Sequence, residues 1–382
     1  MLDSKKTIFI VLFIGVLTSL FLINQNSNNT TSKSSHQLVN TSNITRKFTK
    51  EEKNIHSVKS KYKSDTYTLA KYKEVDIPEI DVKTFKITAA GDCTIGWDTN
   101  FGYGNRLDHV FEMNNHDYSY FYKNVKDIFE SDDITYVNFE GTFTNNNVKV
   151  PKKFNFKAPP SYVKVLQEGD VEVVGIANNH SCDYGQIGYN ETINTFKENN
   201  IDYFGYDNYL IKDINGIKVG FFGFIDIDAV KYKTVDNAVA YLKSQNCDLI
   251  IAAVHWGIEK DYVQTNAQIN LGHYMIDNGV DLVIGTHPHV IQGIEKYKDK
   301  YIIYSLANFL FGGNENPADK DTFIFQQTFT FLDGNLLLDH NIEIIPASVS
   351  SIKKNNNYQP TPLTDKEAMR VLDKIYKHSI NM

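Results

Sequence analysis

Two histidines flank a proline in the stretch THPH, where His287 and His289 follow an apolar run that is typical of a buried strand. Imidazole nitrogens are common metal ligands, and Pro288 restricts the backbone between the two rings, which lowers the entropy lost on binding. Two histidines in a loop are equally compatible with an ordinary connection. The pair therefore predicts a metal site only if the rest of the chain supplies further ligands.

Other apolar stretches end in residues of the same chemical kind. TFKITAAGD ends at Asp92, DITYVNFEG ends just past Glu140, and VEVVGIANNH ends at Asn179 and His180. DLIIAAVHWG carries His255 close to its end. Taken alone, each residue has an ordinary alternative, such as a helix cap, an ion pair, a turn or a hydrogen-bonded core histidine. Because ligands of open α/β sheets bind at the carboxyl ends of the strands, the shared placement predicts one common site.

The chemistry of these side chains favours a divalent transition metal. Carboxylate, amide and imidazole groups are hard-to-borderline ligands that suit Mn, Fe, Zn or Co, and they do not indicate a soft thiolate site. Two ions bridged by a carboxylate can orient a nucleophile and hold an oxyanion during hydrolysis. We expect one or two ions, bound by Asp92, Glu140, Asn179, His255, His287 and His289. His180 is then a candidate proton donor to a leaving group.

Neighbouring residues receive less specific interpretations. Asp183 could orient His180 or cap the helix that follows, and the capping interpretation is preferred; Asn178 is interpreted as a structural turn residue. The three cysteines are too few, and odd in number, for a disulfide framework. Cys93 and Cys182 are interpreted as small apolar filler beside the site. The chain has no H-E-x-x-H motif, P-loop or nucleophile elbow, so those chemistries have no support.

The elements that must position the site alternate between strands and helices, which predicts an α/β fold with a largely buried sheet. The main expected strands cover 84–92, 133–141, 171–180, 248–257 and 281–289. The expected helices cover 103–128, 160–168, 186–198, 235–245 and 264–279. Towards the C-terminus the pattern predicts a hairpin around Asp333-Gly334 and a final amphipathic helix over 364–380.

The first part of the chain has a different composition. Residues 7–23 contain no charged side chain, and a helix over them would be about 25 Å long, close to the hydrocarbon core of a bilayer. Lys5 and Lys6 precede this run, which favours an N-terminus inside and the remainder outside the cell. A cleaved signal peptide is the alternative, but the stretch offers no A-x-A cleavage site. We expect a membrane anchor over 1–23, a flexible polar stalk over 24–63 and a folded domain over 64–382.

The overall charge excludes one class of partner. The 382 residues carry a formal net charge of −7, whereas nonspecific nucleic-acid binding needs a basic surface. An anionic ligand would gain nothing from long-range attraction and would need local help, such as a metal ion.

From about Phe85 to Phe311 the chain carries, in this order, the motifs AAGDCTIG, VNFEGTFT, IANNHSCDYGQIGYNET, VHWGIE, GTHPHVIQG and YSLANFLF. Taken together, these motifs resemble those of the CapA/PgsA family of bacterial capsule and poly-γ-glutamate synthesis proteins. The resemblance implies a divergent member of the calcineurin-like metallophosphatases. Such proteins fold as a four-layer α/β/β/α sandwich of two mixed sheets, and the late hairpin is then expected in the second sheet.

By the same resemblance Asp92 is similar to the first metal aspartate, and Glu140 stands where a bridging carboxylate would. Asn179 resembles the ligand asparagine, and His180 the catalytic histidine beside it. The remaining ligands would be His255, His287 and His289. The chain departs from the pattern in the first motif, where Cys93-Thr94 follows the aspartate and the usual Asp-x-His is absent. Thr286 and Ala307 replace the His and Gly that are frequent in the family, and neither is a clear ligand position.

Two functions follow as expectations. One is a membrane-anchored, extracytoplasmic metal-dependent hydrolase or transferase that acts on a phosphoester or a γ-glutamyl bond. The other is a non-catalytic assembly or export subunit that holds an anionic polymer such as poly-γ-glutamate, together with membrane-bound synthesis partners. The incomplete first motif favours the second, whereas the number of other ligands favours the first. A cell-wall or polysaccharide enzyme outside capsule synthesis is a third, weaker alternative.

Overall fold

The computed structural model describes residues 80–226, 231–338 and 341–382. The expected anchor and stalk lie outside these residues, as does the beginning of the expected folded domain. Within the described ranges, none of the helices combines the length and apolar character needed to cross a bilayer.

The first sheet is built around the long strand β1 (Val82–Thr94), which carries Asp92 near its end. In spatial order the sheet contains β18 (Thr361–Pro362), β17 (Ile342–Ser348), β15 (Asp321–Leu332), β1, β3 (Ile134–Phe139), β6 (Val173–Gly175) and β7 (Asp202–Phe204). Two further strands join it, β14 (Asn308–Phe311) beside β1 and β16 (Asn335–Leu337) beside β15. The strands β1, β3, β6 and β7 are parallel to one another, β15 runs antiparallel to β1, and β17 runs antiparallel to β15.

The second sheet has a parallel centre and antiparallel edges. In spatial order it contains β12 (Ile294–Tyr297), β13 (Lys300–Ile303), β11 (Leu282–Thr286), β10 (Leu249–His255), β9 (Ile217–Ile225) and β8 (Leu210–Ile214). The four central strands are parallel, and β12 and β8 run antiparallel at the edges. The carboxyl ends of β10 and β11 therefore lie side by side, which brings His255 level with Thr286.

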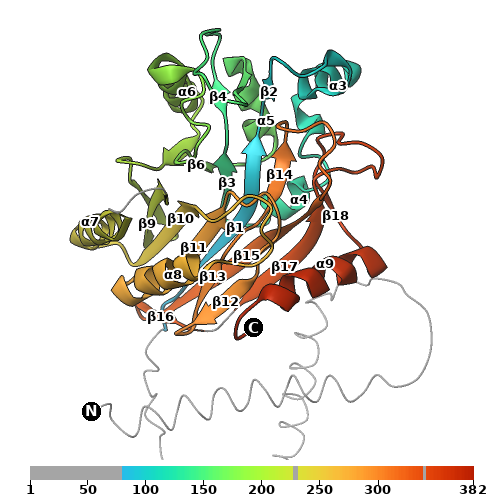
Figure 1. Ribbon diagram of the computed structural model, residues 1–382. Helices are drawn as coiled ribbons and strands as arrows, with labels where there is room; N and C mark the ends of the chain where they lie inside the picture. The colour runs from blue at the N-terminus through green and yellow to red at the C-terminus, as the bar shows by residue number, and fades with distance from the viewer. Residues whose placement is uncertain (1–79, 227–230, 339–340) are drawn as a thin grey trace, which may run out of the picture. The chain divides into compact units, whose positions relative to one another are not determined.

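The two sheets pack face to face, with helices on both outer sides (Figure 1). Alternate residues of β1, such as Ile87 and Ala89, share the inner core with Ile251 and Ala253 of β10. The outer face of the first sheet is covered by α3 (Leu107–Met113), α4 (Lys126–Phe129), α5 (Val163–Glu168) and α6 (Gly185–Glu198). The outer face of the second is covered by α7 (Lys231–Ser244) and α8 (Asn266–Asn278). The predicted α/β class is confirmed as a mixed fold with several sheets.

The last helix, α9 (Asp365–His378), closes the inner core rather than an outer face. Its Val371 and Ile375 are fully buried among the residues between the sheets. Figure 1 shows α9 lying alongside β17 and β12, which are edge regions of different sheets. A small third sheet, made of β2 (Trp97–Asp98), β5 (Phe156–Ala158) and β4 (Thr142–Phe143), follows the carboxyl ends of β1 and β3 along the chain.

Three sequence predictions need correction. The helix expected over 103–128 is interrupted: α3 is followed by Asn115 and His116, whose left-handed φ values of 57° and 58° end it, and only short turns and α4 come after. The strand expected over 171–180 ends at Gly175, where the chain leaves the sheet for a turn. The hairpin at Asp333-Gly334 is present, but it joins the first sheet because β15 pairs with β1 from Val82 to Ala89.

Candidate metal centre

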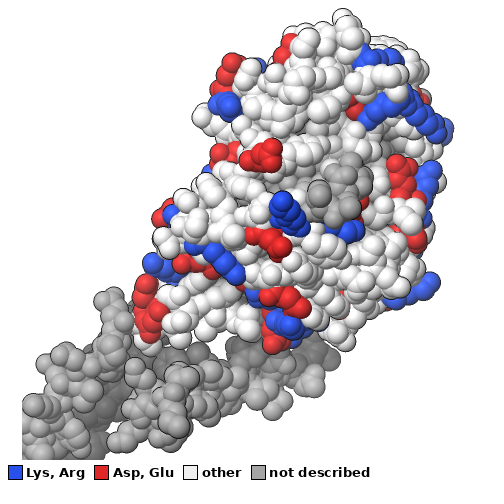
Figure 2. All heavy atoms as spheres, turned by 60° about the vertical axis from the view of Figure 1, so that its left-hand side comes forward, with Lys and Arg blue, Asp and Glu red and all other residues white. Residues whose placement is uncertain are grey.

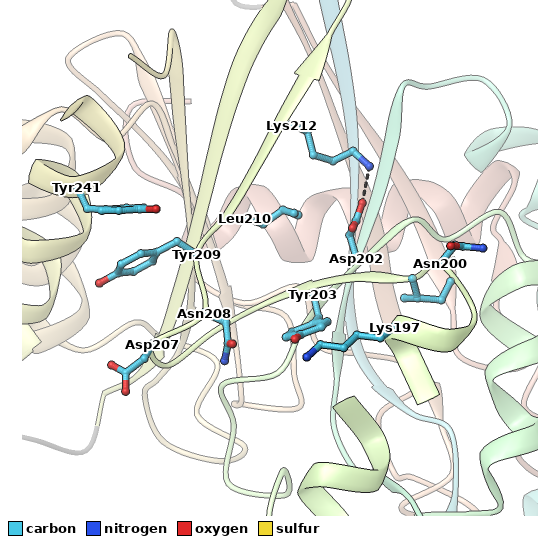
Figure 3. Close-up of a pocket in the computed structure, with 11 residues that line it drawn as sticks. Lys197, Asn200, Asp202, Tyr203, Asp207, Asn208, Tyr209, Leu210, Lys212 and Tyr241 are labelled. Carbon is cyan, nitrogen blue, oxygen red and sulfur yellow. Dashed lines mark hydrogen bonds and ion pairs between the residues drawn. The ribbon is translucent and has the colours of Figure 1, made fainter. Parts of the chain in front are cut away.

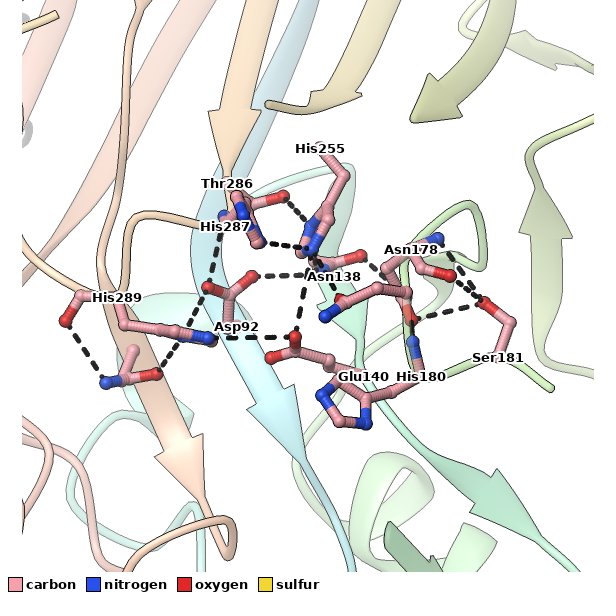
Figure 4. Close-up of polar contacts among 12 residues, drawn as sticks. Asp92, Asn138, Glu140, Asn178, His180, Ser181, His255, Thr286, His287 and His289 are labelled. Atoms are coloured by element: carbon pink, nitrogen blue, oxygen red, sulfur yellow. Dashed lines mark hydrogen bonds and ion pairs between the residues drawn. The ribbon is translucent and has the colours of Figure 1, made fainter. Parts of the chain in front are cut away.

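The predicted site residues come together at the carboxyl ends of strands from both sheets (Figure 4). The first sheet supplies Asp92 from β1 and Glu140 directly after β3, and the loop after β6 supplies Asn179 and His180. The second sheet supplies the last residue of β10, His255, and the loop after β11, which carries His287 and His289. The first sheet thus contributes the oxygen ligands, and the second the imidazoles.

One candidate subsite consists of Asp92, Glu140 and His289, each of which places one ligand atom within 4.8 Å of the others. His289 Nδ1 is 3.2 Å from Asp92 Oδ2, and His289 Nε2 is 3.9 Å from Glu140 Oε1. Both carboxylates are fully buried, and neither oxygen of Glu140 has a hydrogen-bond partner. A buried carboxylate that lacks partners is strongly unfavourable, so the position fits a cation.

A second candidate subsite lies on the other side of Glu140. His255 Nε2 is 2.9 Å from Asn179 Oδ1, 3.0 Å from His287 Nδ1 and 3.8 Å from Glu140 Oε1. Two ligands that each bind one ion at about 2.1 Å are themselves about 3 Å apart. The three closest donors therefore have the spacing of ligands to a single ion. Glu140 is within reach of both subsites and could bridge them.

Electrostatics favours a positive charge at the first subsite. Burial raises the pKa of Glu140 to about 8, against the opposing effect of His289. Burial lowers the pKa of His289, but the carboxylates of Glu140 and Asp92 outweigh it and raise this pKa to about 10. Burial acts to raise the pKa of Asp92, but contacts with His289 outweigh it, so this pKa is lowered. In the absence of metal, the proton on His289 therefore supplies the charge that a cation would supply.

At the second subsite, electrostatics favours neutral imidazoles and not a bound proton. Burial lowers the pKa of His255 well below its usual value, and burial together with the charge of His289 lowers that of His287. Both imidazoles are therefore neutral near pH 7, and each has a lone pair available for a metal.

The candidate proton donor His180 is held by a carboxylate. Its Nδ1 lies 2.7 Å from Asp183 Oδ2, which also accepts a hydrogen bond from the Phe156 backbone N–H at 2.6 Å. Lys152 forms an ion pair with Asp183 and donates to the Asn179 carbonyl at 2.8 Å. Because Nδ1 is engaged, Nε2 is the nitrogen that could exchange a proton with a substrate. Burial lowers the pKa of His180 despite the nearby carboxylate.

These contacts decide the role of Asp183. The residue at the N-cap of α6 is Tyr184, and no side chain caps that helix end. The preferred interpretation of Asp183 as a helix cap was therefore wrong, and the alternative, orientation of His180, describes its contacts.

The sequence did not single out Asn138, whose amide side chain holds a candidate ligand. Asn138 donates to Asp92 Oδ1 at 2.7 Å, and its own oxygen accepts from Asn178 at 3.1 Å. Asn178 Oδ1 in turn accepts from the backbone N–H of His180 at 3.0 Å, in keeping with its interpretation as structural. Asn138 could have been found from its period-two spacing with Glu140, because such residues share one face of a strand.

The remaining neighbours are not ligands. Thr286 Oγ1 is 3.1 Å from His255 Nδ1, the ring nitrogen opposite the candidate metal position. The buried Cys93 lies 3.3 Å from the Tyr122 hydroxyl, and burial raises the pKa of its thiol to about 12, so a thiolate is disfavoured. Cys93 is filler, as expected, whereas Cys182 is exposed.

A separate surface groove of about 820 Å³ lies along β7 and β8, away from the candidate ligands (Figure 3). Its lining includes the ring pair Tyr209 and Tyr241, whose centroids are 5.0 Å apart, and the ion pair between Lys212 and Asp202. None of the predicted site residues lines this groove.

Comparison with known proteins shows the family to which this chain belongs. The sequence profile described as "Bacterial capsule synthesis protein PGA_cap" matches residues 86–313. The chain belongs to this family. The "Capsule biosynthesis protein CapA" of Bacillus anthracis is 30% identical over 300 residues, which cover 68% of this chain and 72% of that protein. The "PGA biosynthesis protein CapA" of Bacillus subtilis is 30% identical over 232 residues, or 54% of this chain and 60% of that one.

Similarity to solved structures is more distant. A hypothetical protein from Thermus thermophilus superposes with a TM-score of 0.41 at 14% identity, covering 69% of this chain and 98% of that one. The sulfate thiohydrolase SoxB from the same species superposes with a TM-score of 0.40 at 9% identity, covering 77% of this chain and 60% of the other. Likenesses this weak say nothing about the chemistry of the site.

Proposed function

We propose that this protein is a membrane-anchored, extracytoplasmic member of a capsule or poly-γ-glutamate synthesis or export system. Membership of the capsule synthesis family and the two CapA relatives support the role in capsule or poly-γ-glutamate synthesis. The anchor would be residues 7–23, which would place the domain beside membrane-bound polymer synthesis partners. Lys, Arg, Asp and Glu side chains are interspersed on the face drawn in Figure 2. We expect an anionic polymer, and not nucleic acid, as the ligand.

We further propose that the domain is of the metallophosphatase type and is a metal-dependent hydrolase or transferase acting on a phosphoester or a γ-glutamyl bond. The observation that carries this proposal is Glu140, a buried carboxylate without hydrogen-bond partners that lies between the two sets of candidate ligands. One or two ions of Mn, Fe or Zn, held by those ligands, would polarise a phosphoryl or carbonyl oxygen of the substrate.

The side chains around these ligands would carry the proton chemistry. Asp183 and Lys152 would hold His180 with Nε2 directed towards the reacting bond, where the imidazolium form would give its Nε2 proton to the leaving group and become neutral. The ring of Phe156, whose centroid is 4.4 Å from that of His180, would limit access of water to this side of the imidazole.

A non-catalytic assembly or export subunit is the second candidate function. The observation that favours it is Thr94, which stands where related enzymes carry a histidine. Its fully buried Oγ1 has no hydrogen-bond partner. With one imidazole fewer, the first subsite would bind its ion more weakly and would be better suited to holding a polymer than to cleaving it.

Metal content of the full chain, purified without chelator and measured by mass spectrometry, tests the proposal. We expect near-stoichiometric transition metal in the native protein, and loss of it in a His287→Ala/His289→Ala variant. His273→Ala is the matched control, because this histidine pairs with Glu295 on the second sheet and should leave the metal content unchanged. Metal absent from the native protein, even after loading with Mn or Zn, would contradict the hydrolase.

Turnover separates the two functions once metal is shown. Phosphoesters and γ-glutamyl peptides would be screened with the native protein and with an Asp92→Ala variant. Turnover that disappears in the variant would establish the enzyme. Metal binding without turnover of any of these substrates would favour the polymer-holding subunit.

A further inference from the structure

Asn308 lies directly behind the first candidate subsite and contacts one of its ligands twice. Its Oδ1 is 2.8 Å from His289 Nδ1, and its Nδ2 donates to the backbone carbonyl of His289 at 3.2 Å. The second contact fixes which end of the amide is the oxygen, so the oxygen faces the ring. Asn308 is only 3% exposed, and it therefore has no alternative partner in solvent.

The backbone holds this amide in place from both sheets. β14 pairs with β1 so that Asn308 is opposite Asp92, whose N–H donates to the Ala307 carbonyl at 2.9 Å. The preceding residues are tied to the second sheet, through a hydrogen bond from Leu306 N–H to the Gly285 carbonyl at 3.2 Å. Asn308 thus has little freedom to move away from His289.

Ala307 has a left-handed backbone, with φ at 66°. This conformation costs a residue other than glycine about 1–2 kcal/mol. Such strain persists where the surroundings fix the backbone, and it is concentrated at functional sites. At this position it turns the chain so that the next side chain, Asn308, faces the ligands.

These contacts determine which nitrogen of His289 can bind a metal. An imidazole that binds through one nitrogen donates the N–H of the other to a fixed acceptor. Two oxygens lie near Nδ1, Asn308 Oδ1 at 2.8 Å and Asp92 Oδ2 at 3.2 Å. Once a cation engages the Asp92 carboxylate, the amide oxygen of Asn308 is the acceptor that remains. Nε2, which faces Glu140 at 3.9 Å, is then the free donor.

We propose that Asn308 is a positioning residue of the metal centre, which accepts the Nδ1 proton of His289 and so presents Nε2 to the ion shared with Asp92 and Glu140. This inference rests on the metal site of the proposed function. Because Thr94 supplies no imidazole in the first motif, this subsite depends more strongly on the correct orientation of its one histidine. The role assigned to Asn308 is orientation and not ligation.

The test is a metal titration of the full chain, first stripped with chelator, with Mn²⁺ or Zn²⁺ followed by calorimetry. We expect Asn308→Ala to weaken binding about 10- to 100-fold, as loss of such partners does at other metal sites. Asn308→Asp keeps an acceptor oxygen and should remain within a few-fold of the native protein. If the alanine variant does not fold, Asn308→Ser serves instead, because its short hydroxyl does not reach Nδ1.

Asn356→Ala is the matched control. This asparagine is equally buried, at 3% exposure, and donates to the carbonyls of Phe311 and Asn314 near the other end of β14. It contacts no candidate ligand, so its removal should lower the unfolding temperature without changing the metal affinity.

A second readout separates orientation from ligation. The visible absorption of the Co²⁺-loaded protein reports the number of ligands, and at saturation it should be the same in Asn308→Ala and the native protein. A changed spectrum would mean that Asn308 itself binds the ion, and unchanged affinity in Asn308→Ala would remove its role; either result overturns the inference. A native protein that binds no metal would instead contradict the proposed function, so the two failures are distinguishable.

Discussion

Two pairs of acidic residues in this domain differ in what neutralises them. Asp319 and Asp321, at the start of β15, face Lys374 and Arg370 of α9, and Asp321 accepts hydrogen bonds from both terminal guanidinium nitrogens of Arg370, Nη1 and Nη2, at 2.7 Å. The other pair, Asp92 and Glu140, has close by, among the described residues, the imidazole of His289 as its one positively charged partner in the absence of metal. A cluster that the chain neutralises itself serves packing, whereas one that it leaves open is suited to an external cation.

We call Asp92 and Glu140 the open pair, and Asp319 and Asp321 the closed pair. The largest difference between them should appear when one carboxylate of the open pair is made neutral. Glu140→Gln removes the group shared by both candidate subsites, so we expect metal affinity to fall by more than about 100-fold, since loss of an outer partner alone costs 10–100-fold. The metal-free protein should lose little stability, because a buried carboxylate without partners is replaced by an uncharged amide. Calorimetric titration and thermal unfolding of the same samples measure both effects. A large loss of stability without metal would show that Glu140 is structural.

Metal addition should raise the free energy of unfolding of the native protein. An ion present at about 100 times its dissociation constant adds about 2.7 kcal/mol to the free energy of unfolding when it binds only the folded state. Thermal unfolding with and without Mn²⁺ or Zn²⁺ measures the shift. Asp321→Asn should retain the full shift and Glu140→Gln should lose it. An equal shift in both variants would place the ion somewhere other than the candidate centre.

The closed pair should show a smaller effect, which depends on pH. Asp321→Asn should lower the free energy of unfolding by about 1 kcal/mol near pH 7, a modest value because Arg370 is half exposed and such pairs are screened by solvent. Burial acts to raise the pKa of Asp321, but Arg370 and Lys374 outweigh it, so the folded pKa lies below the usual value. The contribution is therefore present above the usual aspartate pKa of about 3.9 and is lost as the pH falls through the folded value.

Denaturant unfolding at several pH values between 7 and the acid range checks whether the contribution of Asp321 to stability decreases as the pH falls. Glu367→Gln is the control, because Glu367 also pairs with Arg370 but is 48% exposed and should contribute much less. A difference between Asp321→Asn and the native protein that stays constant down to the lowest pH would contradict the assignment.

The contrast between the two acidic pairs also explains which parts of the site and fold could be predicted from the sequence. The candidate ligands follow apolar runs, and that local pattern is enough to place Asp92, His255 and His289 at the carboxyl ends of strands. The sequence could not predict that Arg370 and Lys374 pair with Asp321, because α9 is distant from β15 along the chain and contacts it only in the folded state. The sheet to which the hairpin at Asp333-Gly334 belongs depends on such long-range pairing too.

Residues that support the ligands were harder to predict than the ligands themselves. Asparagine is common in turns, so Asn308 carries no signal that distinguishes a supporting amide from an ordinary turn residue, and for Asn138 the only signal is its period-two spacing with Glu140. Asp183 precedes a helix, which is the usual place of a cap, and only the folded loop brings its carboxylate to His180. The backbone strain at Ala307 leaves no trace in composition or periodicity.

That strain gives the smallest predicted effect and a test of whether it serves the open acidic pair. Ala307→Gly removes the left-handed penalty but increases the freedom of the unfolded chain, so we expect a gain in stability of at most about 1 kcal/mol and unchanged metal affinity. Ala307→Val should lose stability and also weaken metal binding, since a branched residue resists the left-handed backbone that directs Asn308 to His289. Thermal unfolding and metal titration of both variants decide the matter. If Ala307→Val lowers stability but leaves metal affinity unchanged, the strained turn at Ala307 contributes to packing alone. Its role would then be structural, like that of Asp319 and Asp321, and not part of metal binding.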